Sequence, residues 1–433
     1  MKRKILILIG IAISLSISQA QYDTMYFIKG NAVVNQQSIA EADLDSIITY
    51  RPGESHFIEP LGPVRVGINR TDLYWMEGGL SAQTTLLDSI RAVGCEYVRF
   101  TLQAYTLREQ VRDHILYCNQ IGLKPLVCIM LGSIKQLYPT GTELVNRLRP
   151  GEPRMFWDGY PVSKLDETRF ETFMQDVLTY WKNAGCVIDV IELGNELNWI
   201  DFNGDLPYYP NGQGKVFNNT YTWNTLPEAV RTFPRKAGFA AKKTKELVTT
   251  IFPDNPPRVI VGGLSAGNLN YLGWLVGVGA SVLAPDMALK IMKGTAPEQP
   301  AGSENYLNGV DGVCLHLYPY GDCPFVENSV TKKADTTKMT NDVIKYFDRW
   351  VPAVREISEL PIYITEFGYE TTTYGAANDW KRAEQYKAYI SAMRQSQSKY
   401  NWHTLYVYNW DRGTFQIFDG KAMPSAYAIF GGQ

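Results

Sequence analysis

The sequence predicts an α/β fold, a closed (β/α)8 TIM barrel in a single domain, and three observations support it. Short runs rich in Val, Ile, Leu or Tyr recur along the chain, with the composition of strands buried on both faces of a parallel sheet. Segments with apolar residues at helical spacing lie between them. Eight such strands in 433 residues, with no low-complexity linker, favour one closed barrel.

Eight apolar runs are expected to form the strands, at residues 64–69, 97–102, 125–131, 187–193, 259–264, 313–317, 362–365 and 404–408. Helical stripes precede the second, fourth, seventh and eighth strands, at residues 86–93, 170–181, 343–354 and 383–393. The alternative for this alternation is a doubly wound open sheet, which usually carries a Gly-rich phosphate turn after its first strand. Residues 66–70 (Val-Gly-Ile-Asn-Arg) are not such a turn, so the closed barrel is favoured.

The chain is expected to have three parts. Residues 1–20 have the pattern of a signal peptide, with a basic start, a short apolar run over 5–17 and a small-x-small cleavage site at Ala20. Because that run is too short to span a bilayer comfortably, cleavage and a secreted or periplasmic location are expected rather than a membrane anchor. No second apolar stretch is long enough to cross a membrane. Residues 21–62 are expected to pack on the barrel, which residues 63–433 would form as the catalytic domain.

Composition and charge bear on the class of partner. A formal net charge of -2 gives no reason to expect nucleic acid or an anionic membrane surface. The aromatic content of 12% suits stacking against sugar faces, although many of these rings must be core. The sequence predicts no particular oligomeric state.

Six cysteines form an even set, which fits disulfides in an exported protein: Cys95, Cys118, Cys128, Cys186, Cys314 and Cys323. However, Cys128 and Cys314 lie within apolar runs expected to be strands, and no Cys-x-x-Cys pair occurs. Most of these thiols are therefore expected to be small core residues, with no zinc site. Cys314–Cys323 is the one short-range disulfide to test.

Two glutamates end expected strands. Glu196 closes the run Val-Ile-Glu-Leu-Gly-Asn-Glu after the fourth strand, and Glu366 ends the seventh strand in Ile-Tyr-Ile-Thr-Glu-Phe-Gly. The carboxyl ends of the strands form the active-site face of a TIM barrel. Glycoside hydrolysis needs one carboxyl to protonate the leaving oxygen and a second to attack the anomeric carbon or activate water, with no metal or other cofactor. Glu192, four residues before Glu196, is expected to be a buried, paired structural carboxylate.

With these two motifs the chain resembles the clan A glycoside hydrolases, the superfamily of cellulases, mannanases, xylanases and many exo-glycosidases. The resemblance extends from about residue 64 to residue 430. It implies that Glu196 is the acid/base, that Glu366 is the nucleophile and that Asn195 hydrogen-bonds the substrate's 2-hydroxyl. The implied mechanism retains the anomeric configuration, which requires the two carboxyls to be about 5–5.5 Å apart.

Further positions match the clan. Arg99 stands where the clan has a strand-two Arg, which is implied to pair with the nucleophile and keep it ionised. His316 and Tyr318 match a strand-six His-x-Tyr, whose Tyr is implied to donate to the nucleophile. Trp410 matches the strand-eight Trp that forms the floor of the subsite for the cleaved sugar.

Long insertions follow the third and fourth strands, at residues 133–164 and 198–227, and their aromatic residues are expected to line a cleft. Trp199 is the predicted substrate contact among them. Two positions depart from the clan, because Leu197 follows Glu196 where Pro is frequent and the third strand carries Cys128 where a His is often found. The sugar and the linkage are left open by these mixed signals.

The favoured function is hydrolysis of glycosidic bonds, expected to be β, in a polysaccharide or oligosaccharide by double displacement. Two alternatives fit the same cleft. One is a carbohydrate-binding pseudoenzyme that does not cut the glycan, and the other is a transglycosylase that uses the same residues with an acceptor other than water. The sequence does not separate endo from exo action.

Overall fold

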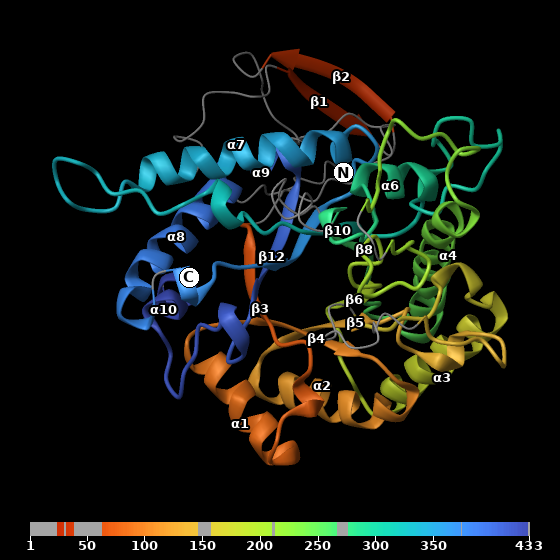
Figure 1. The fold of residues 1–433 in the computed structure, drawn as a ribbon, viewed down its shortest axis with the longest axis horizontal. Helices are drawn as coiled ribbons and strands as arrows, with labels where there is room; N and C mark the ends of the chain where they lie inside the picture. The colour runs from red at the N-terminus through yellow and green to blue at the C-terminus, as the bar shows by residue number, and fades with distance from the viewer. Residues whose placement is uncertain are drawn as a thin grey trace, which may run out of the picture. The chain divides into compact units, whose positions relative to one another are not determined.

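Eight parallel strands close into a barrel in the structure, which is a computed structural model (Figure 1). The strands are β3 (Arg65–Asn69), β4 (Tyr97–Leu102), β5 (Lys124–Ile129), β6 (Val190–Leu193), β8 (Arg258–Ser265), β10 (Gly312–His316), β11 (Ile362–Phe367) and β12 (Trp402–Tyr408). They are hydrogen-bonded in chain order, and β12 pairs with β3 to close the barrel. Each strand overlaps one of the eight expected runs, so the predicted (β/α)8 fold is confirmed.

The structure describes residues 24–29, 32–38, 63–145, 157–209, 213–265, 276–373 and 375–431. The expected signal peptide, residues 1–20, lies outside the described residues. Two described strands, β1 (Thr24–Lys29) and β2 (Ala32–Ser38), pair antiparallel within the N-terminal unit Met1–Pro60, whereas the barrel belongs to the unit Leu61–Gln433. The packing of residues 21–62 on the barrel stays a prediction.

Helices surround the strands of the barrel (Figure 1). They are α1 (Gly79–Ala92), α2 (Arg108–Ile121), α3 (Glu167–Asn183), α4 (Glu228–Ile251), α6 (Pro285–Lys293), α7 (Thr336–Arg355), α8 (Asp379–Gln395), α9 (Gln397–Tyr400) and α10 (Pro424–Phe430). All four predicted helical stripes fall on them; in α3, for example, Phe170, Val177 and Trp181 are buried. A short parallel pair, β7 (Val216–Phe217) and β9 (Val282–Leu283), lies outside the barrel sheet. Among the helices that the structure describes, none has both the length and the apolar character that a membrane crossing requires.

The apolar core of the barrel has two parts, because strand residues alternate between the two faces of the barrel wall, and a small third cluster lies around Trp199. The larger part packs the outward strand residues against the helices, as Val98 and Val127 do. The smaller part fills the barrel interior and consists of residues on the strands or directly after one: Tyr97, Leu126, Cys128, Met130, Val190, Ile260, Cys314, Tyr363 and Tyr406. The interior is therefore a packed floor, above which a site can be built at the carboxyl ends of the strands.

All six cysteines are buried free thiols, so the expectation that most are small core residues is confirmed. The candidate disulfide Cys314–Cys323 is wrong. Cys314 belongs to the barrel interior, whereas Cys323 belongs to the apolar layer between the barrel and the helices. The strand wall therefore separates the two sulfurs, and nine residues of separation along the chain could not reveal that.

Candidate active site

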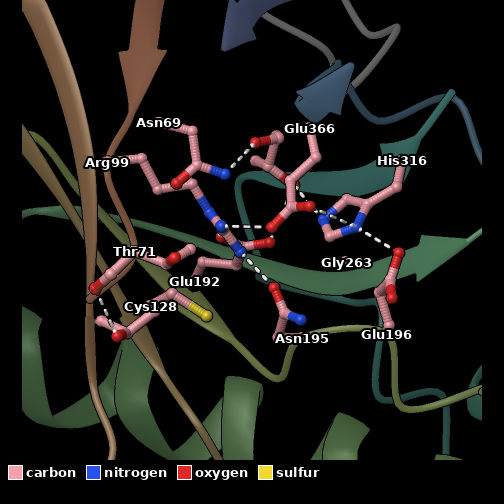
Figure 2. Close-up of polar contacts among 12 residues, drawn as sticks. Asn69, Thr71, Arg99, Cys128, Glu192, Asn195, Glu196, Gly263, His316 and Glu366 are labelled. Carbon is pink, nitrogen blue, oxygen red and sulfur yellow. Dashed lines mark hydrogen bonds and ion pairs between the residues drawn. The ribbon is translucent and has the colours of Figure 1, made fainter. Parts of the chain in front are cut away.

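The strand topology brings the two predicted glutamates to one rim of the barrel. Glu196 follows the carboxyl end of β6, and Glu366 lies one residue before the carboxyl end of β11. Between them in the sheet, β10 ends at His316, which is the pairing partner of Glu366. The structure thus brings Arg99, Asn195, Glu196, His316, Tyr318 and Glu366 together, and Figure 2 shows all of these except Tyr318 labelled around one centre.

Glu366 is buried and surrounded by hydrogen-bond donors. Arg99 Nη1 lies 2.8 Å from its Oε1, and the hydroxyl of Tyr318 donates to its Oε2 at 2.9 Å. Burial alone would raise the pKa of Glu366, but the positive charges of His316 and Arg99 and the hydrogen bonds from Tyr318 and Asn69 outweigh burial and lower it. The carboxylate is therefore kept ionised, as a nucleophile must be.

Arg99 connects three strands from a fully buried position. Its Nε donates to Glu192 Oε2 at 2.6 Å and its Nη2 donates to Asn195 Oδ1 at 2.7 Å, in addition to the bond to Glu366. The guanidinium can fill these three positions because its five N–H donors are held in one plane. The interpretation of Glu192 as a buried, paired structural carboxylate agrees with this geometry.

Glu196 has a different environment from Glu366. Its Oε1 lies 2.9 Å from His316 Nδ1, and its side chain keeps 15% of its surface exposed, against 9% for Glu366. Its backbone lies in the left-handed region at φ +45°, and its N–H donates to the carbonyl of Gly263 at 2.7 Å. A carboxyl with one histidine partner and access to solvent is suited to exchange a proton with a substrate oxygen or with water.

Gly263, which sequence reasoning missed, allows this arrangement. A Cβ at this position would lie 2.9 Å from the Gly194 carbonyl oxygen and 3.0 Å from Glu192 Oε1. Its φ of +51° is also disfavoured for residues with a side chain. The pair Gly262-Gly263 in the sequence is the signal that could have identified this close approach.

The spacing of the two carboxyls selects between the two forms of glycoside hydrolysis. One oxygen of Glu196, one of Glu366 and Nδ1 or Nε2 of His316 all lie within 4.8 Å of one another. This is closer to the separation of about 5–5.5 Å in retaining enzymes than to about 6.5–9.5 Å in inverting ones. By this measure the spacing is nearer to that of the retaining form than to that of the inverting form.

The same three side chains are the one group among the described residues whose ligand atoms could hold a metal ion. In this structure those atoms already pair with one another and with the site's donors, since Glu366 accepts from Arg99 and Tyr318 and His316 contacts Glu196. This pairing fits proton chemistry without a cofactor, which stays a prediction.

Trp410 does not form the floor of the site, so that prediction is wrong. Its ring is fully buried, stacks on Phe418 with centroids 5.1 Å apart, and donates from Nε1 to the Ser89 hydroxyl of α1, outside the barrel. The aromatic residue of β12 nearest the site is instead Tyr408, at the end of the strand, whose ring lies 6.3 Å from that of Tyr318. Burial, followed by the charges of Glu366, Asp72 and Glu196, raises the pKa of Tyr408 to about 12.

Trp199 is not an exposed cleft residue, and its contact with substrate stays a prediction. Its side chain is 4% exposed and packs with Ile200, Ala280 and Val282. Its backbone N–H donates to the carbonyl of Glu196 at 2.8 Å, so it supports the loop that carries Glu196. Trp75 and Trp157, by contrast, are 65% and 62% exposed in loops that follow strands.

Searches with known families and curated proteins give no match to this sequence. Solved structures with a similar architecture include an exo-beta-1,4-mannosidase from Opitutaceae bacterium strain TAV5, at 12% identity and a TM-score of 0.47 over 85% of this chain and 58% of that one. A broad-specificity endoglucanase from Clostridium longisporum has 12% identity and a TM-score of 0.45 over 85% of this chain and 95% of that one. A Streptomyces cattleya glycoside hydrolase in complex with GlcNAc has 13% identity and a TM-score of 0.48 over 85% and 79%. The present chain thus spans somewhat more than half the length of the mannosidase.

Proposed function

We propose that this protein is an exported retaining glycoside hydrolase of the clan A type, which cleaves glycosidic bonds, β by expectation, in a polysaccharide or oligosaccharide. Glu366 is the nucleophile and Glu196 the acid/base. Export rests on the signal-peptide pattern of residues 1–20 in the sequence. The chemistry rests on the site.

The observation that carries the proposal is the unequal environment of two carboxyls at the spacing of a retaining enzyme. Glu366 accepts hydrogen bonds from Arg99 and Tyr318, which stabilise its anionic form. Glu196 has His316 as its side-chain partner and is the more exposed of the two. Double displacement requires one carboxylate held ionised as the nucleophile and a second carboxyl within reach of the leaving oxygen and of water.

The reaction follows from these positions in two steps. Glu366 attacks the anomeric carbon and forms a glycosyl ester, while Glu196 gives its proton to the departing glycosidic oxygen. Glu196 then removes a proton from water, which attacks the same carbon, frees Glu366 and restores the proton on Glu196. Because Asn195 Oδ1 accepts from Arg99, its amide Nδ2 is directed to donate to a sugar hydroxyl.

Glu366→Gln tests the proposal on a panel of polysaccharides and aryl glycosides, with release of reducing ends or of the aryl alcohol as the measurement. Hydrolysis should fall by roughly four orders of magnitude, because the amide cannot attack, while the melting temperature stays near that of the wild type. Glu356→Gln, an exposed glutamate at the end of α7, is the matched control and should leave hydrolysis unchanged. Wild-type-like hydrolysis by Glu366→Gln would refute the assignment.

A second measurement separates the roles of the two glutamates. In Glu196→Ala, added azide should replace water in the second step and give a glycosyl azide with the configuration of the substrate. In Glu366→Ala, azide should attack the substrate directly and give the opposite configuration. Binding of glycans by the wild-type protein without any turnover would instead indicate the pseudoenzyme.

A further inference from the structure

A chain of hydrogen bonds connects the acid/base to the buried arginine through His316. His316 Nδ1 lies 2.9 Å from Glu196 Oε1, and on the other side of the ring Nε2 lies 3.1 Å from the hydroxyl of Thr365. That hydroxyl donates to Glu192 Oε1 at 2.8 Å, and Glu192 Oε2 accepts from Arg99. Figure 2 shows the imidazole of His316 between Glu366 and Glu196. Thr365 and Glu192 are the members of this chain to which the proposed mechanism gives no part, and Thr365 is the one that contacts His316 directly.

The protons of this chain can be placed by counting donors. Glu192 is ionised by its ion pair with Arg99 at 2.6 Å, so both of its oxygens only accept. Thr365 has a single hydroxyl proton, which it gives to Glu192, and towards His316 it can therefore only accept. His316 Nε2 must then carry a hydrogen, and any gain or loss of a proton by the ring takes place at Nδ1.

We infer that Thr365 is a positioning residue that reserves Nδ1 of His316 for exchange of the catalytic proton with Glu196. One proton is shared between Glu196 Oε1 and His316 Nδ1 in the resting site. It leaves to the glycosidic oxygen in the first step, and a proton from water replaces it in the second, so the balance of the reaction is unchanged. Without Thr365 the Nδ1–H tautomer, which can donate to either catalytic carboxylate, would be favoured.

The charges around the ring agree with an exchanging proton at this position. The charged side chains that act on His316 are Glu196 after β6, Glu366 on β11, whose Oε2 lies 3.6 Å from Nδ1, and Arg99 on β4. Tyr318 and Glu192 lie one hydrogen bond further away, on Glu366 and Thr365. Burial lowers the pKa of His316, but the negative charges of Glu366 and Glu196 outweigh burial and raise it. The ring is thus fully buried, yet able to hold the proton.

The tautomer can be observed without any substrate, so this test is independent of the proposed function. The protein has four histidines, and two-bond 1H–15N correlations of the 15N-labelled full chain distinguish the Nε2–H, Nδ1–H and doubly protonated rings. His316→Gln identifies the His316 signals. Above the pH at which His316 loses its proton, the wild type and Thr365→Ser should show Nε2–H, whereas Thr365→Val should show Nδ1–H. The inference would be overturned by an Nε2–H ring in Thr365→Val or by an Nδ1–H ring in the wild type. The wild-type measurement tests the inference even if Thr365→Val does not fold.

Kinetics test the catalytic part of the inference, which rests on the proposed function. Thr365→Val should slow hydrolysis of glycosides with poor leaving groups about tenfold or more, while dinitrophenyl glycosides, which need little acid assistance, form the glycosyl-enzyme at the wild-type rate. The alkaline limb of the kcat/KM profile should move to lower pH by about one unit, and Thr365→Ser should restore both properties. Equal slowing of both classes of leaving group would overturn the catalytic part.

Thr404→Val is the matched control, because Thr404 is another buried strand threonine whose hydroxyl contacts a different histidine, His403. It lies near the beginning of β12, at the other end of the strand from Tyr408. It should change neither the His316 signals nor the leaving-group dependence. If the wild type hydrolyses no glycoside while the tautomers behave as stated, the proposed function fails and the positioning role of Thr365 stands.

Discussion

Two adjacent layers of the barrel interior are made by the same strands and differ completely in chemistry. The lower layer is the apolar floor, represented by Tyr97, Val190, Cys314 and Tyr363. The upper layer consists of the residues two positions further along the same four strands: Arg99, Glu192, His316 and Thr365. All four residues of the upper layer are fully buried, and those of the floor are buried as well. Two strand positions therefore separate packing from chemistry, since inward residues recur with period two.

The difference between the layers lies in how burial is compensated. In the lower layer, removal of apolar surface from water is itself favourable. In the upper layer every charge must have a partner, because a buried charge without one is strongly destabilising. Arg99 provides this compensation for Glu192 and Glu366 together. The upper layer should therefore respond to substitution far more strongly than the lower one.

The largest effect is expected for Arg99→Met. It leaves two buried carboxylates without their cation and should lower the free energy of unfolding by about 3–5 kcal/mol, together with a loss of hydrolysis. Urea unfolding at neutral pH measures the change. Arg112→Met is the control, because Arg112 pairs with Asp113 on the surface and should cost less than about 1 kcal/mol. Equal losses in the two variants would show that the upper layer is not held by its charges.

A smaller effect is expected where sequence and structure disagree about the aromatic residue of the site. Tyr408→Leu removes the ring that packs near Tyr318 and should lower kcat/KM roughly tenfold. Trp410→Phe should leave kcat/KM unchanged and lower the free energy of unfolding by about 1 kcal/mol, because it loses the hydrogen bond to Ser89. A loss of kcat/KM in Trp410→Phe with none in Tyr408→Leu would mean that Trp410, and not Tyr408, belongs to the site.

These cases show what the sequence could predict. The strands, and the glutamates at the ends of two of them, follow from local pattern, because a buried strand and the residue that ends it are contiguous in the chain. Trp410 and Tyr408 are two residues apart, and which ring faces the site depends on where β12 ends and the chain turns outward. The role inferred for Thr365 depends on its contacts with Glu192 on β6 and His316 on β10. Contacts between residues of different strands cannot be predicted from the sequence of one segment.

The pH dependence of hydrolysis provides a finer test of the upper rim. The pKa of Glu366 is lowered, so its carboxylate stays ionised to a lower pH than that of an ordinary glutamate. The same shift stabilises the folded protein at pH values above the ordinary pKa, and this stabilisation is lost as the pH falls through the pKa of the folded state. The acid limb of kcat/KM should therefore lie below the pH expected for an ordinary glutamate. Tyr318→Phe removes one donor and should move this limb to higher pH by up to about one unit, and the exposed Tyr427→Phe should not. An unmoved limb in Tyr318→Phe would mean that its hydroxyl does not stabilise the anion.

The smallest effect, and one of opposite sign, is expected in the floor. The hydroxyl of Tyr406 is buried without a hydrogen-bond partner among the residues that the structure describes. Tyr406→Phe removes that hydroxyl while keeping the ring in the apolar layer, so the free energy of unfolding should stay the same or rise by about 1 kcal/mol. Hydrolysis should not change, since Tyr406 lies two residues below Tyr408 on the same strand. If Tyr406→Phe lowered the free energy of unfolding as much as Arg99→Met does, polar pairing would support the floor as well. The two layers would then not differ in how burial is compensated.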